Sequence, residues 1–171
     1  MKVFGIIGWK NSGKTGLMER LVAEITARGL TVSTIKHAHH SFDVDHPGKD
    51  SYRHRNAGAS QVLLSSANRW ALMSELRGAP EPSLDQLLAQ LNPVNLVLIE
   101  GYKRDSHAKI EAHRAVTGQD LIAPNDQTVL AVASDSQHPD LTQPVFDLDD
   151  TSGIANFILN YSELQSTCGA A

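Results

Sequence analysis

Hydrophobic residues along this chain form two patterns: short unbroken runs, and stretches in which they recur every three or four positions. Unbroken apolar runs bounded by polar or turn residues indicate buried strands, and a spacing of three and four indicates helices. The runs lie at residues 3–7, 96–99 and 129–133, and the helical spacings lie at residues 14–28, 84–91 and 151–161. Residues 30–36, rich in β-branched side chains, are a further predicted strand. Because strands and helices alternate, the pattern predicts an α/β fold with a mostly parallel central sheet and helices on both faces.

Shorter elements are predicted between these. Ser83 and Gln86 form a capping box in front of the helical spacing at residues 84–91. A short helix is expected over residues 51–59, with Asp50 as its cap. Both helices have a local start signal in the sequence.

Three further segments are predicted to form short strands. Residues 61–65 and 70–74 are strand-like runs that either form a hairpin or enter the main sheet separately. Residues 109–114 alternate well enough for a short strand with one solvent-exposed face. By contrast, residues 37–50 show no period, and a loop of this length inside a compact domain is usually functional.

Composition narrows the class of protein. The 171 residues suit one domain, so residues 1–171 are expected to form a single domain with a disordered tail from about residue 165. The net charge is −4 and there is no run of like charges, so the sequence does not indicate binding to nucleic acid or to an anionic membrane. No apolar stretch is long enough to span a bilayer. The first strand begins too early for a signal peptide, and the single cysteine, Cys168, fits a reducing cytoplasm.

The strongest motif runs from Gly8 to Thr15 and reads Gly-Trp-Lys-Asn-Ser-Gly-Lys-Thr. It matches the phosphate-binding P-loop, in which glycines let several backbone N–H groups point at an anion. The loop needs a strand before it and a helix after it, and both are predicted here. Lys14 would reach the outer phosphates, and the Thr15 hydroxyl would hold a magnesium ion. The motif therefore predicts a nucleotide site formed by Gly8, Lys10, Asn11, Ser12, Gly13, Lys14, Thr15 and Gly16.

A carboxylate follows the buried run at residues 96–99. A P-loop protein places its partner for magnesium or for the attacking water at the end of such a strand, and Glu100 stands there where aspartate is usual. Gly101 could bring its N–H group near a terminal phosphate. Lys103 and Arg104 either offset phosphate charge or are merely solvated.

The loop at residues 37–46 holds four histidines and two aspartates. One interpretation is a nucleotide-sensing switch loop, with Asp45 near magnesium. A second is a transition-metal site for zinc or nickel, formed by histidine and aspartate. A third is a solvated polar loop without a ligand.

Asp135 follows the predicted strand at residues 129–133, after Ser134. A carboxylate here could accept hydrogen bonds from both the ring N–H and the amino group of guanine, a donor pair that adenine lacks. The fuller Asn-Lys-x-Asp motif is absent, so the sequence favours guanine only modestly.

Five segments resemble one known family in combination: residues 8–15, 35–40, 43–52, 69–73 and 99–103. Together they are similar to the MobB family, the adaptor proteins of molybdopterin-guanine dinucleotide biosynthesis. The resemblance extends to about Asp149. The loop Lys-His-x-His-His, followed by Asp-Val-Asp-x-Pro-Gly-Lys-Asp-Ser, is more specific than the P-loop alone.

The resemblance implies a P-loop NTPase sandwich of three layers that binds GTP with magnesium and hydrolyses it slowly. It implies a homodimer that assists MobA, the guanylyltransferase that joins GMP to molybdopterin. Carried over by position, residues 8–15 bind phosphate, and Thr15 and Glu100 lie near magnesium. Gly16 stands where many P-loops carry threonine or serine, which removes a hydroxyl from the α-phosphate.

Two other classes stay open: a metallochaperone GTPase whose histidine loop carries a metal, and a small-molecule kinase. The kinase would need an arginine-rich lid, and residues 77–82 carry one arginine. The runs around Trp70 and Ile110 are the expected edges for a two-fold interface. No arginine is placed near the phosphates by motif, which predicts slow turnover and an adaptor role.

Overall fold

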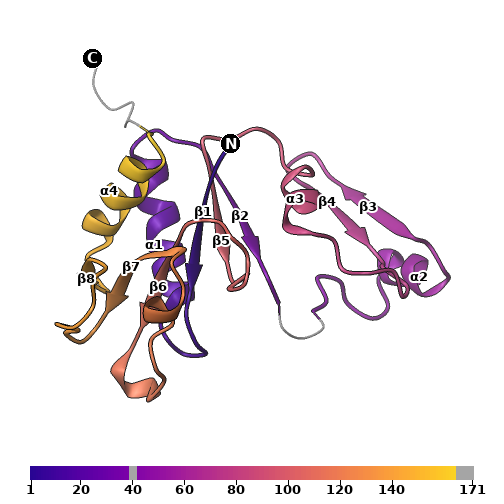
Figure 1. Cartoon of the computed structure of the whole chain (residues 1–171). Coiled ribbons are helices and arrows are strands. Elements are labelled where there is room, and N and C mark those ends of the chain that lie inside the picture. The colour runs from indigo at the N-terminus through magenta and orange to yellow at the C-terminus, as the bar shows by residue number, and fades with distance from the viewer. Residues whose placement is uncertain (39–41, 165–171) are drawn as a thin grey trace, which may run out of the picture. The chain divides into compact units, whose positions relative to one another are not determined.

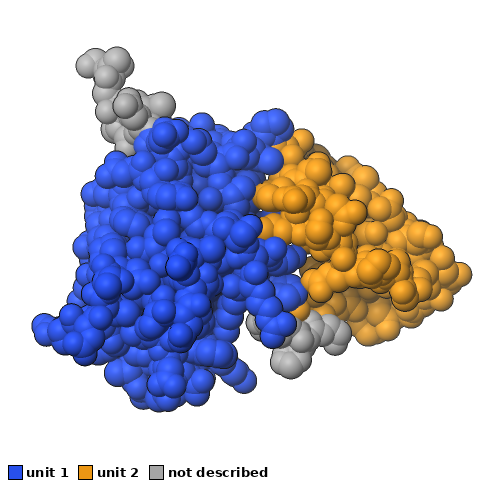
Figure 2. All heavy atoms as spheres, in the orientation of Figure 1, with its two compact units in different colours: residues 1–37, 93–171 blue, residues 38–92 orange. Residues whose placement is uncertain are grey.

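The computed structural model describes residues 1–38 and 42–164. The chain divides into two compact units, a first unit of residues 1–37 and 93–171 and a second unit of residues 38–92 (Figure 2). His39 and His40 lie outside the described residues, as does the tail from residue 165. Within the described ranges, no helix has the length and apolar character needed to cross a membrane.

The first unit is built on a six-stranded sheet with the order β2-β5-β1-β6-β7-β8 (Figure 1). All neighbouring strands in it are parallel. The strands are β1 (Lys2–Ile7), β2 (Val32–Lys36), β5 (Leu96–Glu100), β6 (Lys109–His113), β7 (Val129–Ser134) and β8 (Val145–Asp147). The predicted α/β fold with a mostly parallel sheet is confirmed.

Two helices pack on one face of this sheet. Helix α1 (Lys14–Ala27) and helix α4 (Thr151–Tyr161) lie side by side (Figure 1) and share one core with Phe4 and Ile6 of β1. Their buried residues recur at helical spacing because only one stripe of each helix faces the sheet. Burial of each such side chain stabilises the fold by about 1.5–3 kcal/mol. The buried residues are Leu17, Met18, Leu21 and Ile25 in α1, and Ile154, Ala155, Ile158 and Leu159 in α4.

Strand β6 differs from its prediction. All five of its residues are buried, whereas the sequence predicted one exposed face, because β6 lies inside the sheet between β1 and β7. Its polar side chains are satisfied locally. The Glu111 carboxylate accepts hydrogen bonds from the N–H groups of Ile122 and Ala123 at 2.8–3.0 Å. The Lys109 ammonium group lies 3.8 Å from a carboxylate oxygen of Asp126.

Two 3₁₀ turns and one strand were not predicted. The turns are η1 (Ala115–Thr117), one residue after β6, and η2 (Ala123–Asn125), which packs on the face of the sheet opposite α1 through Ala123 against Ile7 and Val132. Strand β8 has only three residues, too few for a pattern of two-residue period to stand out.

The second unit contains α2 (Asp50–Asn56), β3 (Gln61–Ser65), β4 (Trp70–Ser74) and α3 (Leu84–Leu88). Strands β3 and β4 form an antiparallel hairpin of their own, which decides between the two predicted placements. The capping box of Ser83 and Gln86 is confirmed. The predicted cap of α2 is wrong, because Asp50 is the first residue of the helix and Lys49 precedes it without a side-chain cap.

Candidate nucleotide-binding site

The loop between β1 and α1 has the backbone of a phosphate-binding loop. Gly8, Asn11 and Gly13 have positive φ angles of 143°, 66° and 91°, which turn the chain sharply after the strand. A side chain at Gly8 would meet the Ala112 carbonyl oxygen at 2.2 Å, so only glycine fits there. The sequence motif and the folded loop therefore agree.

This loop and the first turn of α1 line a cavity of about 340 Å³. Its lining residues are Asn11, Ser12, Gly13, Lys14, Thr15, Gly16 and Arg114. The Ser12 hydroxyl is buried and has no hydrogen-bond partner among the described residues. A buried hydroxyl without a partner costs free energy that a bound polar ligand can recover. The cavity is also at a helix N-terminus, where backbone N–H groups favour an anion.

Lys14 extends across the loop. Its ammonium group donates a hydrogen bond to the Trp9 carbonyl oxygen. Burial lowers the pKa of Lys14, and the positive charge of Lys103 lowers it further. A phosphate anion beside Lys14 would oppose both effects, because it favours the charged ammonium form.

Thr15 and Glu100 lie together on the β5 side of the loop. The Thr15 hydroxyl donates to a Glu100 carboxylate oxygen at 3.3 Å, and the Lys36 ammonium group lies 3.2 Å from the same oxygen. Strand β5 pairs with β1, with Glu100 opposite Ile6, and this register sets the carboxylate beside the loop. A hydroxyl and a carboxylate oxygen are ligands of the kind that magnesium prefers.

Gly101 continues from Glu100 with a φ angle of 100°. Its N–H group donates to the Ile6 carbonyl oxygen at 3.2 Å, so in this structure it serves the sheet. A side chain here would lie 3.0 Å from the Cβ atom of His37. The His37 ring stacks on Tyr102 with 4.6 Å between the ring centroids.

Of the two basic residues after Gly101, Lys103 has a defined contact. Its ammonium group lies 4.0 Å from the centre of the Trp9 ring, and burial lowers its pKa. The Trp9 indole N–H donates to the Asp120 carbonyl oxygen at 2.8 Å. Arg104 is exposed, as is Lys10 of the loop.

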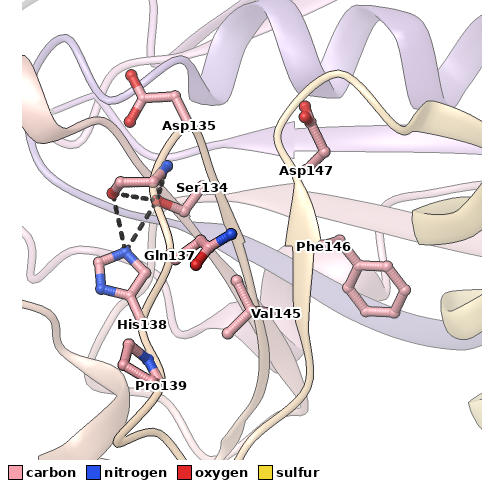
Figure 3. A pocket seen from close by; sticks show the side chains of 9 residues that line it. Ser134, Asp135, Gln137, His138, Pro139, Val145, Phe146 and Asp147 are labelled. Atoms are coloured by element: carbon pink, nitrogen blue, oxygen red, sulfur yellow. Dashed lines mark hydrogen bonds between the residues drawn. The ribbon is translucent and has the colours of Figure 1, made fainter.

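Asp135 lies at a second cavity, of about 550 Å³, at the carboxyl ends of β7 and β8 (Figure 3). One of its carboxylate oxygens accepts a hydrogen bond from the Ala115 N–H group at 2.8 Å. The other oxygen accepts none from the part of the chain that the structure describes. Asp135 therefore keeps hydrogen-bonding capacity at the cavity edge.

A chain of polar side chains forms the wall beside Asp135. The Ser134 hydroxyl lies 2.9 Å from His138 Nε2 and 3.1 Å from the Ser136 hydroxyl (Figure 3). On its other side it lies 3.1 Å from His113 Nδ1. Burial lowers the pKa of His138, and the nearby His113 lowers it further.

The two cavities follow one edge of the sheet. In the strand order β5, β1, β6, β7, the carboxyl ends carry in turn Glu100, the P-loop, Arg114 and Asp135. Three strand spacings of about 4.8 Å separate β5 from β7, or roughly 14 Å. Ligands of open parallel sheets bind along this edge.

Arg114 is the residue in this arrangement that the sequence did not point to. It follows β6 directly, and a methyl group placed on Gly13 would lie 3.1 Å from its Nε atom. A basic residue at the end of the strand predicted over residues 109–114 was the only local signal. Its proximity to the loop depends on β6 lying next to β1, and the sequence does not state the strand order.

Asp45 belongs to the second unit, whereas Thr15 and Glu100 belong to the first. One Asp45 carboxylate oxygen accepts from the His46 N–H group at 2.9 Å, and the other lies 3.7 Å from Arg55 Nε. Arg55 also bonds Asp43 at 2.8 Å, and hydrogen bonds from the Asp45 backbone and Arg55 lower the pKa of Asp43. Asp45 thus has local partners.

A resident metal in the histidine loop receives no support from the described residues. Among them, no group of three or more histidine, cysteine, aspartate or glutamate side chains could hold an ion. Two of the four loop histidines, His39 and His40, lie outside these residues.

The parallel sheet and the glycine loop between β1 and α1 define an α/β protein of the P-loop NTPase fold. Residues 3–135 match the family model of MobB, described as molybdopterin guanine dinucleotide synthesis protein B. The chain belongs to this family.

Known proteins agree with this assignment. A molybdopterin-guanine dinucleotide biosynthesis adapter protein of Escherichia coli (strain K12) is 39% identical over 92% of this chain and 91% of its own length. The Haemophilus influenzae protein of the same name is 42% identical over 93% of this chain and 88% of its own length. The crystal structure of a MobB protein homolog from Bacillus stearothermophilus matches with a TM-score of 0.71 at 28% identity, covering 95% of this chain and 99% of that chain.

Proposed function

We propose that this chain is a GTP-binding adapter in the biosynthesis of molybdopterin guanine dinucleotide. It would assist a guanylyltransferase of the MobA type, in the reducing cytoplasm, as that enzyme attaches GMP to molybdopterin. The observation that carries the proposal is the P-loop cavity with Thr15 and Glu100 beside it. The family and the names of its relatives supply the pathway.

In this proposal the backbone of residues 8–16 and the Lys14 ammonium group hold the phosphates. Thr15 and Glu100 would hold magnesium, which offsets phosphate charge when it is bound. The Thr15 hydroxyl already points at Glu100, so a cation between them would replace a hydrogen bond of 3.3 Å. The pair is thus oriented before the ligand arrives.

Asp135 would read the base. The carboxylate is fixed through Ala115 and retains an oxygen toward the cavity. Guanine offers two donors to a carboxylate and adenine does not. The nucleotide would then extend along the sheet edge, with its outer phosphate near Glu100 and its base near Asp135.

Slow hydrolysis follows from the same arrangement. Glu100 pairs with Lys36 and would hold magnesium in the GTP complex, so it would not be free to orient a water molecule. Fast phosphoryl transfer also needs a cation that offsets transition-state charge, and Lys14 is already committed to the phosphates of the bound nucleotide. A long-lived GTP complex suits an adapter better than an enzyme.

A homodimer would form through the hairpin. Leu63 and Leu72 are register partners on one face, and Trp70 lies on the same face two residues away. These side chains are 60%, 43% and 60% exposed, and Leu72 and Trp70 border a groove of about 910 Å³. The other predicted edge, at Ile110, is wrong, because Ile110 is fully buried in an internal strand.

The test is a set of titrations with GTP, GDP and ATP, each with and without magnesium. We expect GTP to bind more tightly than ATP, and magnesium to strengthen GTP binding more than GDP binding. Equal affinity for GTP and ATP would contradict the role of Asp135. Absence of any nucleotide binding would contradict the proposed function itself.

A further inference from the structure

Arg114 is a cation in the P-loop cavity to which neither the motif nor the proposed function assigns a task. Its guanidinium group lies against Gly13, with Nε 3.1 Å and Cζ 3.5 Å from a methyl group placed on that glycine. The side chain is exposed, and it forms no ion pair or hydrogen bond with the residues that the structure describes. It is therefore available to a ligand in the cavity.

The neighbouring arginine, Arg20, is committed elsewhere. It donates to the Leu148 carbonyl oxygen at 2.7 Å and to the Thr151 hydroxyl at 3.0 Å, and it pairs with Asp149 at 3.3 Å. These contacts join α1 to the start of α4. Of the two arginines at this end of α1, only Arg114 can serve the cavity without breaking contacts within the fold.

The backbone that carries Arg114 is held on both sides. The N–H group of Ala115, the next residue, donates to the Asp135 carboxylate at 2.8 Å. The Arg114 carbonyl oxygen accepts from the Thr117 N–H group at 3.0 Å and from its hydroxyl at 2.8 Å. A long side chain on a fixed backbone loses less conformational freedom when it binds an anion.

The strand order indicates which phosphate Arg114 would meet. Glu100 and β5 lie on one side of β1, and Arg114 and β6 lie on the other, toward Asp135. In a nucleotide that extends from Glu100 to Asp135, the outer phosphate is on the β5 side. The phosphate attached to the ribose is on the β6 side, where Arg114 stands.

The P-loop of this chain lacks the hydroxyl that usually contacts the innermost phosphate. Gly16 lines the cavity together with Arg114, and it has no side chain to donate to the innermost phosphate. A side chain would fit, because its Cβ atom would be 3.6 Å from the nearest atom, Nη1 of Arg20. The missing hydroxyl is therefore not explained by crowding.

We propose that Arg114 binds the α-phosphate of the nucleotide and supplies the contact that Gly16 lacks. This rests on the proposed nucleotide site. Arginine presents planar donors that suit a phosphate, and it stays charged at all relevant pH values. Because GDP and GTP share the α-phosphate, Arg114 would strengthen the binding of both equally.

The experiment compares GDP and GTP affinities of the parent with those of Arg114→Gln and Arg114→Lys, by calorimetry. We expect Arg114→Gln to weaken both nucleotides roughly 10- to 100-fold, and Arg114→Lys to weaken both less. The phosphorus resonance of the α-phosphate of bound GDP should shift in Arg114→Gln. The control is Arg28→Gln, which changes the charge equally at the far end of α1, about 20 Å away, and should leave both affinities unchanged.

A second substitution tests the compensation. Adding Gly16→Ser to Arg114→Gln should restore affinity about three- to tenfold, and more than Gly16→Ser does in the parent. A loss confined to GTP would place Arg114 at the outer phosphate and overturn the inference, as would unchanged affinities in Arg114→Gln. In both cases the parent still binds nucleotide and the proposed function stands. A parent without guanine-nucleotide affinity would instead overturn the proposed function.

Discussion

At the scale of single residues, the site depends on a few side chains whose partners are already in place. Thr15 and Glu100 are hydrogen-bonded to each other, and Lys14 is bonded to the Trp9 carbonyl oxygen. Asp135 is fixed through the Ala115 N–H group. These side chains belong to the polar sheet edge and not to the apolar core, so single substitutions should change binding without unfolding the chain.

Lys14→Ala should weaken GTP binding by roughly 3 kcal/mol, or about two powers of ten, because a charged donor to the phosphates is lost. The melting temperature without nucleotide should change little, since the Lys14 ammonium group is hydrogen-bonded to the loop and is not part of the apolar core. Lys2→Ala removes an ammonium group at the start of β1 that pairs with Glu163, and serves as the matched control. Equal GTP affinity in Lys14→Ala and the parent would refute the P-loop assignment.

Asp135→Asn should lower the preference for GTP over ATP by roughly 1.5–3 kcal/mol. The asparagine oxygen can still accept from the Ala115 N–H group, which turns the new NH₂ group toward the donors of guanine. Asp147→Asn changes the charge equally on the wall of the same cavity and should leave the preference intact. An unchanged GTP to ATP ratio in Asp135→Asn would mean that the base is read elsewhere.

The buried His107 should make the stability of the fold depend on pH. Both of its ring nitrogens are buried and have no partner among the described residues, and its ring lies against Gly5. Burial lowers its pKa, and Lys109 lowers it further, whereas Asp105 and Asp126 oppose the change. The unfolded chain therefore binds a proton more readily than the folded one, and stability should fall as the pH drops below about 6.5.

Urea unfolding at pH 5 and pH 7 tests this. His107→Gln should reduce the difference in unfolding free energy between pH 5 and pH 7. The difference that remains should include a contribution from His138, whose pKa is also lowered. His54→Gln replaces an exposed histidine of α2 and is the control. An identical pH dependence in His107→Gln and the parent would show that His107 does not carry the effect.

At the scale of elements, the sequence predicted most strands and helices because each carries its own periodicity or cap. The helices at residues 14–28 and 151–161 were predicted from their apolar spacing alone. The start of the helix after Ser83 was predicted from the capping box that Ser83 forms with Gln86. The full burial of β6 could not be predicted, because it depends on which strands lie beside it. The role of Arg114 could not be predicted for the same reason, because its position beside the P-loop depends on the strand order. Glu100 could be predicted as a site residue because it follows an unbroken apolar strand.

The hairpin supplies a prediction at this scale. If its Leu63 and Trp70 face forms the homodimer, Leu72→Asp should shift sedimentation at micromolar concentration from about twice 18.6 kDa toward the monomer mass of 18.6 kDa. Leu64 is 42% exposed, nearly as much as Leu72 at 43%, but it projects from the opposite face of the hairpin. Leu64→Asp should therefore leave the dimer intact. A parent that sediments only as a monomer would refute the homodimer.

At the scale of the whole molecule, the resemblance found in the sequence is confirmed by the match to the MobB family over residues 3–135. The fold then explains why three of the five separated segments belong together. These three, the P-loop, the end of β2 and the end of β5, meet at one edge of the sheet because parallel strands end there together. The segments at residues 43–52 and 69–73 belong to the second unit.

The molecule as a whole should turn GTP over slowly. Without a partner, its steady-state rate should lie well below the enzyme median of about 10 per second. The cause is that Glu100 pairs with Lys36 and is assigned to magnesium, and that no arginine is assigned to the transition-state charge on the outer phosphate. Rapid hydrolysis by the isolated protein would contradict a persistent GTP-bound form.

The most direct test of the adapter role is synthesis of the dinucleotide cofactor in a reconstituted reaction. Purified guanylyltransferase of the MobA type, molybdopterin, GTP and magnesium would be combined with the parent chain, with Lys14→Ala, or with neither. The account predicts more cofactor with the parent than without it, and a gain that Lys14→Ala fails to give although it remains folded. Equal yields in all three reactions would contradict it.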